Sequence, residues 1–267
     1  MIKGGNIQVD MLIHNKGTIS PKRFVAIIPA RFASTRFPGK PLVEIAGKTM
    51  IQRVYEQVTK AVENVYVATD DIRIQKACVA FGANVIMTSE LHRSGTDRCY
   101  EAYTKIGEEF DVIINVQGDE PFIQPEQIET LKACFENEKT QIATLAKRIS
   151  KTEGTEFLVD PNHPKLIVNK NDEAMYFSRS VIPFIRGEQV GDWLNAFPYL
   201  KHVGIYAYQS EVLEQLVNLP ASSLEIAESL EQLRWLENGF KIKVGYTNVD
   251  SIGIDTPEDL EKVNKFF

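Results

Sequence analysis

Short apolar runs alternate with segments of helical periodicity through the first half of this 267-residue chain. Continuous apolar runs are typical of strands buried on both faces, and apolar residues that recur every third or fourth position are typical of helices. The alternation predicts βαβ units around a mainly parallel sheet, which is the architecture of an α/β protein. The strand-like runs lie at 24–28, 65–69, 84–87, 111–116 and 142–146.

The second half of the chain is less regular, but it carries no Pro-, Gly- or Ser-rich linker and no internal repeat. We therefore expect a single domain over 24–267, with a smaller elaboration, rather than two independent domains. Residues 183–200 are expected to form a long loop and residues 224–238 one amphipathic helix, and Thr256 has the N-cap position of another helix. Further strand-like runs lie at 166–170, 174–180, 202–208 and 242–247.

The composition is that of an ordinary globular protein, with 43% apolar and 25% charged residues. Thirty basic against thirty-six acidic residues give a net charge of −6, so bulk charge gives no reason to bind nucleic acid or an anionic membrane. The three cysteines argue against a disulfide framework and a zinc site, and they fit a reducing cytoplasm. No apolar run approaches the about 18 residues that a membrane helix needs.

Residues 1–23 have neither the apolar core of a signal peptide nor the pattern of a strand. We interpret them as an N-terminal extension outside the fold. A cloning remnant, an overlong start and a flexible arm are all open interpretations.

The loop after the first strand-like run is rich in cations. Arg31, Arg36 and Lys40 stand close to the flexible Gly39. Cationic side chains and backbone N–H groups together hold polyphosphates, and the end of a parallel strand is where such a loop belongs. The GxxxxGK[ST] spacing of a P-loop is absent. The alternative is a solvated basic loop.

Two aspartates are candidates for binding a metal ion. Asp119 follows the apolar run at 111–116 and so lies at the carboxyl edge of the predicted sheet, and Asp255 stands between a strand-like stretch and a helix. Mg²⁺ is held by one or two carboxylates plus substrate phosphates. Each aspartate also suits a turn or a helix cap, so spacing alone leaves both interpretations open.

Other polar groups have equally plain structural interpretations. The donor-rich loop at 92–98 could be a turn and a helix cap. His202 and Tyr206 share an apolar strand, where a tyrosine is more often part of the core than a ligand contact. Glu231 can reach Arg234 at i,i+3 spacing, which is an ordinary helical ion pair.

Nine motifs stand in a fixed order along the chain: IIPARFASTRFPGKPL (27–42), VATDD (67–71), HRSGTDR (92–98), NVQGDEP (115–121), ATLA (143–146), YFSRSVIP (176–183), HVGIYAY (202–208), LEQLR (230–234) and GIDTPEDL (253–260). Together they resemble the 3-deoxy-manno-octulosonate cytidylyltransferases, or CMP-KDO synthetases, over about residues 24–267. Sialic-acid cytidylyltransferases and sugar-phosphate nucleotidyltransferases share the form of the first loop. As a rule they lack HRSGTDR combined with NVQGDEP and HVGIYAY.

The resemblance implies a three-layer α/β/α nucleotide-diphospho-sugar transferase fold with a mixed, mostly parallel sheet. It implies a nucleotide-binding half (about 24–150) and a sugar-binding and dimerisation half (about 151–267), with a homodimer built around the second. The implied reaction is CTP + KDO → CMP-KDO + pyrophosphate, with Mg²⁺ as cofactor. The product would feed lipopolysaccharide assembly in the cytoplasm of a Gram-negative bacterium.

The resemblance also assigns residues. The implied catalytic set is Arg31, Lys40, Asp119 and Asp255, in which the cations hold the triphosphate and the aspartates ligate Mg²⁺. Cytosine would be read near Ser94, Gly95, Ala143 and Thr144. The KDO pocket would be lined by Arg98, Gln117, Arg179, His202, Tyr206, Glu231 and Gln232, with Arg98 as a charge partner for the sugar carboxylate.

Two rival functions are open at this point. One is a cytidylyltransferase for another acid sugar, such as 8-amino-KDO or sialic acid, which would differ only in the sugar pocket. The other is a non-catalytic sugar-nucleotide sensor with the same fold. A sensor tends to lose a metal carboxylate or the lysine of the phosphate loop, whereas Lys40, Asp119 and Asp255 are all present.

Overall fold

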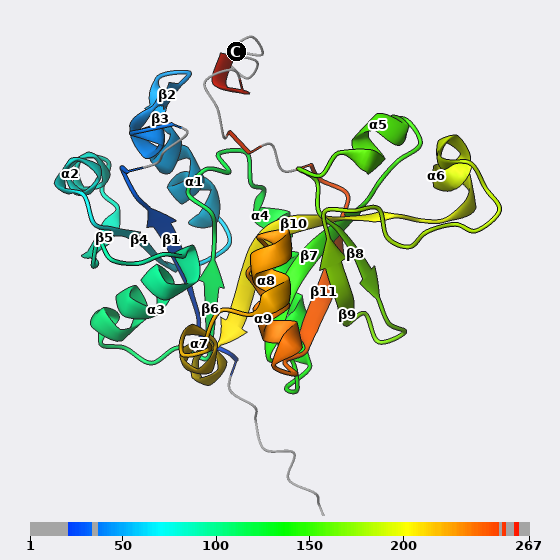
Figure 1. The fold of residues 1–267 in the computed structure, drawn as a ribbon. Helices are drawn as coiled ribbons and strands as arrows, with labels where there is room; N and C mark the ends of the chain where they lie inside the picture. The colour runs from blue at the N-terminus through cyan, green and yellow to red at the C-terminus, as the bar shows by residue number, and fades with distance from the viewer. Residues whose placement is uncertain (1–20, 34–36, 251–252, 255–258, 262–267) are drawn as a thin grey trace, which may run out of the picture.

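The computed structural model describes residues 21–33, 37–250, 253–254 and 259–261, which form an α/β fold around one large sheet (Figure 1). Within these residues the sheet has nine strands, in the order β11-β7-β10-β6-β1-β4-β5, with β8 paired to β10 and β9 paired to β8. A two-stranded hairpin of β2 (Glu44–Ile45) and β3 (Lys48–Thr49) stands apart. The strands are β1 (Phe24–Ala30), β4 (Asn64–Thr69), β5 (Asn84–Met87), β6 (Val112–Asn115), β7 (Ile142–Arg148), β8 (Lys165–Val168), β9 (Ala174–Ser178), β10 (Leu200–Gln209) and β11 (Ile242–Thr247).

The sheet is mixed and mostly parallel, as the alternation of elements predicts. Strands β6, β1, β4 and β5 form a continuous parallel block. Strand β10 runs antiparallel to both β6 and β7, and β11 returns parallel to β7. The carboxyl ends of β1, β4, β5 and β6 therefore meet at one edge of the sheet.

Helices cover both faces of the sheet, which gives the predicted three layers (Figure 1). Ala26 of β1 packs on one face with α1, α2 and α4, and Ile27 packs on the other with α3, α7 and α9. Both residues are fully buried, as expected for a strand without polar alternation. The helices are α1 (Met50–Val58), α2 (Ile72–Ala80), α3 (Gly95–Ile106), α4 (Pro125–Ala133), α5 (Gly154–Val159), α6 (Trp193–Ala196), α7 (Ser210–Val217), α8 (Ser223–Glu228) and α9 (Gln232–Glu237).

The smaller elaboration is built from β8, β9, α5 and α6, and its helices project away from the main sheet at the right of Figure 1. Residues 183–200 were expected to be a loop, but they include a 3₁₀ turn (Val190–Asp192) and α6. Trp193 and Tyr199 in this stretch are buried in a small apolar core with Leu158. These aromatic anchors explain why the segment is ordered.

The prediction of one helix over 224–238 is wrong. The segment forms two short helices, because α8 ends at Ser229, whose φ of 51° is left-handed. The predicted helix start at Thr256 lies outside the described residues, as do residues 1–20 of the predicted extension. None of the helices in the described part of the chain is long and apolar enough to cross a membrane.

Candidate active site

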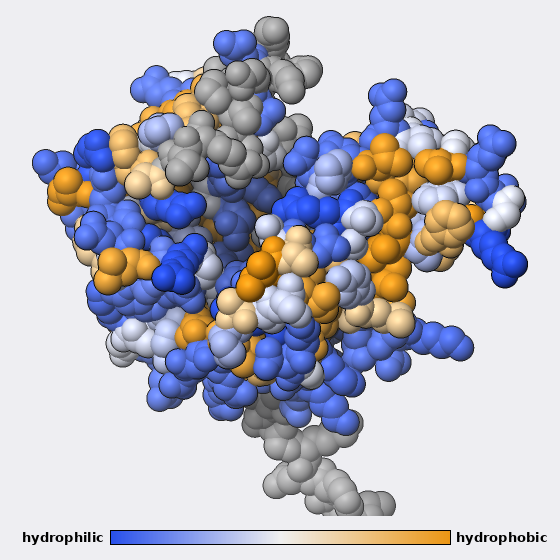
Figure 2. Space-filling view, viewed as in Figure 1, coloured by the Kyte–Doolittle hydropathy of each residue, from blue (hydrophilic) through white to orange (hydrophobic). Residues whose placement is uncertain are grey.

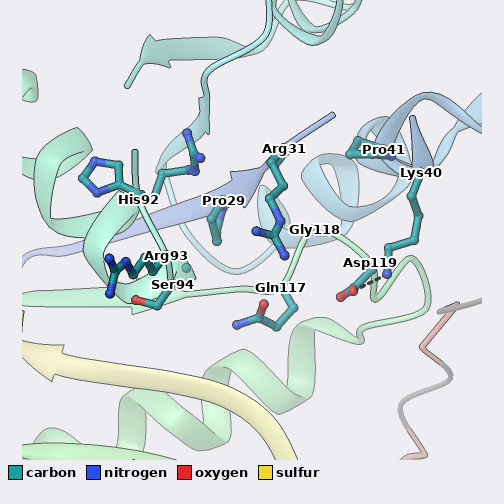
Figure 3. Close-up of a pocket in the computed structure, with 13 residues that line it drawn as sticks. Pro29, Arg31, Lys40, Pro41, His92, Arg93, Ser94, Gln117, Gly118 and Asp119 are labelled. Atoms are coloured by element: carbon teal, nitrogen blue, oxygen red, sulfur yellow. Dashed lines mark hydrogen bonds and ion pairs between the residues drawn. The ribbon is translucent and has the colours of Figure 1, made fainter. Parts of the chain in front are cut away.

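A pocket opens at the carboxyl edge of the parallel block, where the sequence predicts the site. Its walls are the loops that follow β1 and β6 and the N-terminus of α3 (Figure 3). Seven of the predicted site residues line it together. They are Arg31, Lys40, Ser94, Gly95, Arg98, Gln117 and Asp119.

Close approach of the backbone shapes this pocket at Gly118. A Cβ placed on Gly118 would stand 2.8 Å from the main-chain oxygen of Pro29, which is closer than real Cβ atoms come to a neighbour. The loop after β6 can therefore lie against the end of β1 only because position 118 is glycine. Gly95 is less constrained, since the nearest atom to its Cβ would be Pro29 Cγ at 3.3 Å.

The pocket carries more positive than negative charge. Lys40 Nζ lies 2.6 Å from Asp119 Oδ2, and Figure 3 shows the two side chains pointing toward each other at one side of the pocket. Arg31 and Arg93 also line the pocket, and neither makes an ion pair with any residue that the structure describes. Figure 2 shows hydrophilic side chains around a hollow at the centre of the face viewed. An unpaired cationic surface of this kind attracts a polyanion.

The N-terminus of α3 adds backbone donors to the same pocket. Ser94 is the N-cap of this 12-residue helix, and its hydroxyl accepts a hydrogen bond from Asp97 N–H at 3.1 Å. Ser94 and Gly95 face the pocket, so the first turn of the helix presents its positive end there. Helix N-termini bind phosphate groups for this reason.

Asp119 is the predicted metal ligand that lies within the described residues. Its Oδ2 contacts Lys40, and its main-chain oxygen accepts a hydrogen bond from Ile254 N–H at 3.1 Å. Asp255 follows Ile254 in sequence but lies outside the described residues. The described residues hold no cluster of three metal-ligating side chains. One carboxylate at a phosphate pocket nevertheless fits Mg²⁺, which takes one or two carboxylates and completes its shell with phosphates and water.

Arg98 lies in the wall of the pocket rather than free within it. Its side chain is 4% exposed, and its Nη2 forms an ion pair with Asp70 Oδ2 at 2.7 Å. Its Nη1 donates to Thr88 Oγ1 at 2.6 Å and to Ser89 O at 3.2 Å. These contacts join the ends of β4 and β5 to α3. Arg98 therefore supports the wall of the pocket that it lines, and its role as a direct charge partner for a sugar carboxylate stays a prediction.

A second polar cluster adjoins the pocket through Thr96. Thr96 Oγ1 donates to Glu231 Oε2 at 2.8 Å, and Arg234 Nη2 donates to Glu231 Oε1 at 2.7 Å. Burial raises the pKa of Glu231, against the opposing effect of these two donors. Gln232 is 4% exposed, and its Nε2 meets no acceptor among the described residues. A buried amide without an acceptor is suited to receive a ligand oxygen.

His202 and Tyr206 lie near each other on β10. His202 Nε2 is 3.0 Å from Thr144 Oγ1, and the two rings of His202 and Tyr206 are 5.4 Å apart. Burial lowers the pKa of His202 to about 3, so the imidazole is neutral near pH 7. Burial raises the pKa of the Tyr206 hydroxyl. Both side chains can therefore take part in hydrogen bonds as neutral groups.

Three predicted contacts are not supported by where the side chains lie. Ala143 and Thr144 were expected near cytosine, but both are fully buried in β7, which β10 and β6 separate from β1. The Thr144 hydroxyl is 2.8 Å from the main-chain oxygen of Ile205. Arg179 was expected in the sugar pocket, but its guanidinium binds main-chain oxygens outside it.

Sequence reasoning missed two residues that shape the pocket, Arg93 and Gly118. Both lie inside motifs that the sequence analysis singled out, HRSGTDR and NVQGDEP. The signal was therefore present, but spacing does not reveal which member of a loop faces inward. Asp70, the partner of Arg98, likewise stands in the VATDD motif.

Comparisons with known proteins agree with this geometry. A family model described as cytidylyltransferase matches residues 25–242. A 3-deoxy-manno-octulosonate cytidylyltransferase of Parabacteroides distasonis is 62% identical over 245 residues, which cover 91% of this chain and 98% of the relative. One of Bacteroides thetaiotaomicron is 60% identical over 244 residues, covering 91% and 98%. Among solved structures, CMP:2-keto-3-deoxy-manno-octonic acid synthetase complexed with CTP is 44% identical, with a TM-score of 0.83 and coverage of 92% and 98%.

Fold and pocket together define a nucleotidyltransferase with the nucleotide-diphospho-sugar transferase fold. The match over residues 25–242 places the chain among the cytidylyltransferases. Within that class, it belongs to the 3-deoxy-manno-octulosonate cytidylyltransferase family.

Proposed function

We propose that this protein transfers CMP from CTP to 3-deoxy-D-manno-octulosonate (KDO) and releases pyrophosphate. The observation that carries the proposal is the pocket at the sheet edge, where Arg31 and Lys40 face Asp119 beside the N-terminus of α3. This set of donors suits a triphosphate, and the names of the relatives supply the nucleotide and the sugar. The product would serve lipopolysaccharide assembly in the cytoplasm.

The chemistry requires positioning and charge neutralisation rather than covalent catalysis. The anomeric hydroxyl of KDO attacks the α-phosphorus of CTP in line, and pyrophosphate leaves on the opposite side. Arg31, Lys40 and the first turn of α3 bind the phosphates and oppose the charge that grows on the leaving group. Phosphoryl-type transfers depend on this kind of stabilisation.

We propose Mg²⁺ as the cofactor, held by Asp119 and by Asp255. When bound, Mg²⁺ supplies Lewis-acid stabilisation of phosphate charge and favours ionisation of the attacking hydroxyl. A carboxylate has two oxygens, so Asp119 can bind Mg²⁺ through one while Lys40 contacts the other, and the triphosphate gives the ammonium group a further partner. The two proposed roles are thus fulfilled at the same binding event.

The sugar is proposed to lie against the cluster beside Thr96. Gln232 Nε2 offers an unfilled donor, and the neutral His202 and Tyr206 offer groups that match sugar hydroxyls. Gln117 lines the nucleotide pocket, and Glu231 accepts a hydrogen bond from Thr96, next to the pocket-lining Gly95. Another acid sugar, such as 8-amino-KDO or sialic acid, is the alternative substrate.

A homodimer is proposed around the smaller elaboration. Large apolar side chains are exposed there, Met175 at 60% and Phe184 at 72%, and Ile226 on α8 is exposed at 69%. Figure 2 shows hydrophobic side chains gathered on this side of the molecule. Exposed apolar patches of this kind mark protein interfaces. Light scattering on the purified protein should give twice the 30.2 kDa chain mass, and a monomer mass would contradict the proposal.

Pyrophosphate release tests the proposed function directly. Purified protein with CTP and Mg²⁺ should release pyrophosphate only when KDO is added, and ATP or GTP should not replace CTP. Sialic acid and 8-amino-KDO, tested in parallel by kcat/KM, decide the sugar. No release with any acid sugar, while CTP still binds, would contradict the proposal and favour a sensor.

A further inference from the structure

Arg179 connects the end of β9 to the turn between α8 and α9. Its Nε donates to Glu228 O at 2.7 Å, its Nη2 to Ser229 O at 3.3 Å and its Nη1 to Pro161 O at 3.0 Å. All three guanidinium nitrogens thus bind main-chain oxygens. A planar guanidinium is suited to such a task, because its donors are held in a fixed fork.

The contact between Arg179 and Glu228 is reciprocal. The Glu228 carboxylate accepts hydrogen bonds from Arg179 N–H at 3.0 Å and from the Ser178 hydroxyl at 2.6 Å. The side chain of each residue therefore binds the main chain of the other. The end of β9 and the end of α8 are locked together from both sides.

The backbone that this contact holds is strained. Ser229 has a φ of 51°, a left-handed conformation that residues with a Cβ rarely adopt. The two oxygens that Arg179 binds, those of Glu228 and Ser229, belong to the peptide groups on either side of Ser229. The guanidinium thus holds both flanking peptides of the strained residue in place.

The turn presents two residues of the proposed sugar site. Glu231 and Gln232 follow Ser229 by two and three positions, and Glu231 contacts Thr96 beside the pocket-lining Gly95. The Nε2 of Gln232 is buried and meets no acceptor among the described residues. A shift of the turn would displace both side chains from the site.

We propose that Arg179, together with Glu228, is a positioning residue that fixes the α8–α9 turn so that Glu231 and Gln232 are presented to the acid sugar. This proposal rests on the proposed function. It replaces the expectation that Arg179 contacts the sugar itself. The residues that line the nucleotide pocket lie on other elements, and the turn reaches them only through Glu231 and Thr96, so we expect its loss to affect the sugar more than CTP.

Steady-state kinetics of Arg179→Met and Arg179→Lys, with KDO and CTP varied separately, test the proposal. The KM for KDO should rise about tenfold or more in Arg179→Met, because small displacements of positioned groups have large effects. The KM for CTP should stay within about twofold of the wild-type value, since its contacts are unchanged. Arg179→Lys keeps the charge but cannot bridge three oxygens. Its KM for KDO should therefore lie between those of the wild type and Arg179→Met.

Glu228→Gln provides a second variant that removes the reciprocal contact while Arg179 stays in place. It should also raise the KM for KDO selectively, and the double variant Arg179→Met/Glu228→Gln should be no worse than the poorer single variant. Arg148→Met is the matched control, since the Arg148 side chain is exposed at the end of β7 and makes no hydrogen bond or ion pair with the residues that the structure describes. Thermal unfolding of each variant identifies any that fails to fold.

The outcomes separate this proposal from the function on which it rests. A wild-type protein with no KDO-dependent release of pyrophosphate overturns both. An active wild type with an unchanged KM for KDO in Arg179→Met and Glu228→Gln overturns the positioning role alone. Equal increases in both KM values, or additive effects in the double variant, also overturn it.

Discussion

Lys40 Nζ lies 2.6 Å from Asp119 Oδ2, although 79 residues separate the two in sequence. The pair joins the chain after β1 to the loop after β6 at one side of the pocket (Figure 3). The lysine side chain is 13% exposed and that of the aspartate 35%. An ion pair in this position keeps each group near the place where it is proposed to act. We expect a bound triphosphate to compete with Asp119 for Lys40, and a divalent cation to compete with Lys40 for Asp119.

The first prediction follows from that exchange of partners. Asp119→Asn should lower turnover about 100-fold or more at saturating Mg²⁺, the scale of losing one strong electrostatic contact. The affinity for CTP in EDTA should be unchanged or higher, because the Asp119 carboxylate no longer competes with the phosphates for Lys40. Calorimetry in EDTA and pyrophosphate release with Mg²⁺ measure the two effects separately.

Asp192→Asn, on an exposed turn, is the control for the Asp119→Asn variant. Near-normal turnover would contradict the metal role.

The second prediction concerns the close approach at Gly118. Gly118→Ala places a methyl group 2.8 Å from Pro29 O, and a backbone oxygen cannot swing aside as a side-chain tip can. The two pocket loops should separate, and kcat/KM for CTP should fall about tenfold or more. Gly191→Ala adds the same methyl group where nothing lies within 4 Å, so it should leave activity unchanged. Equal activity in the two variants would argue that the loops need not touch.

The third prediction concerns the ion pair of Arg98 and Asp70. Arg98→Ala leaves a half-buried carboxylate without its partner, and it should lower the free energy of unfolding by about 3 kcal/mol. Adding Asp70→Asn should recover part of this loss, since the uncompensated charge is then removed. Urea denaturation measures both effects. We expect the KM values for both substrates to rise, because the wall supports the whole pocket. A selective rise for KDO would instead restore Arg98 as a direct sugar contact.

The fourth prediction is a pH dependence of stability that arises from His202. Burial lowers its pKa from 6.5 to about 3, so the unfolded chain binds a proton between these values while the folded chain does not. Proton binding below pH 6.5 therefore favours the unfolded chain. The contribution of His202 to the free energy of unfolding is complete above pH 6.5 and is lost as the pH falls toward 3.

Urea denaturation of wild type and His202→Gln between pH 6.5 and pH 4 measures this contribution. The wild-type curve should be steeper by up to about 1.4 kcal/mol per pH unit. Glu231→Gln tests the opposite case. Burial raises the pKa of Glu231, so the contribution of this residue to the free energy of unfolding is lost as the pH rises. Parallel curves for wild type and His202→Gln would show that the imidazole is solvated.

Most of the fold could be predicted, because the strand-like runs are determined locally. The run at 24–28 became β1, and the apolar residues at 50–58 became the buried face of α1. The failure at 224–238 has a tertiary cause. Its sequence favours one continuous helix, but Arg179, 50 positions before Ser229, binds the main-chain oxygens around the break. No local pattern in 224–238 reveals that contact.

Part of the candidate site could likewise be predicted from the sequence, and part could not. Lys40 and Asp119 could be placed together because both follow parallel strands, whose carboxyl ends share one edge. Ala143 and Thr144 could not be placed, because the antiparallel β10 lies between β7 and β6. Strand order depends on long-range pairing, and a run of apolar residues carries no information about its neighbours.

The fate of the α-phosphate tests the central claim most directly. CTP labelled at the α-phosphorus is incubated with the protein, Mg²⁺ and KDO, and the products are separated by anion exchange. Our account predicts that the label moves into a KDO-containing nucleotide in amounts equal to the pyrophosphate released, and that Asp119→Asn abolishes nearly all of this transfer. Label that remains in CTP, or that is released as free CMP with or without KDO, would contradict it.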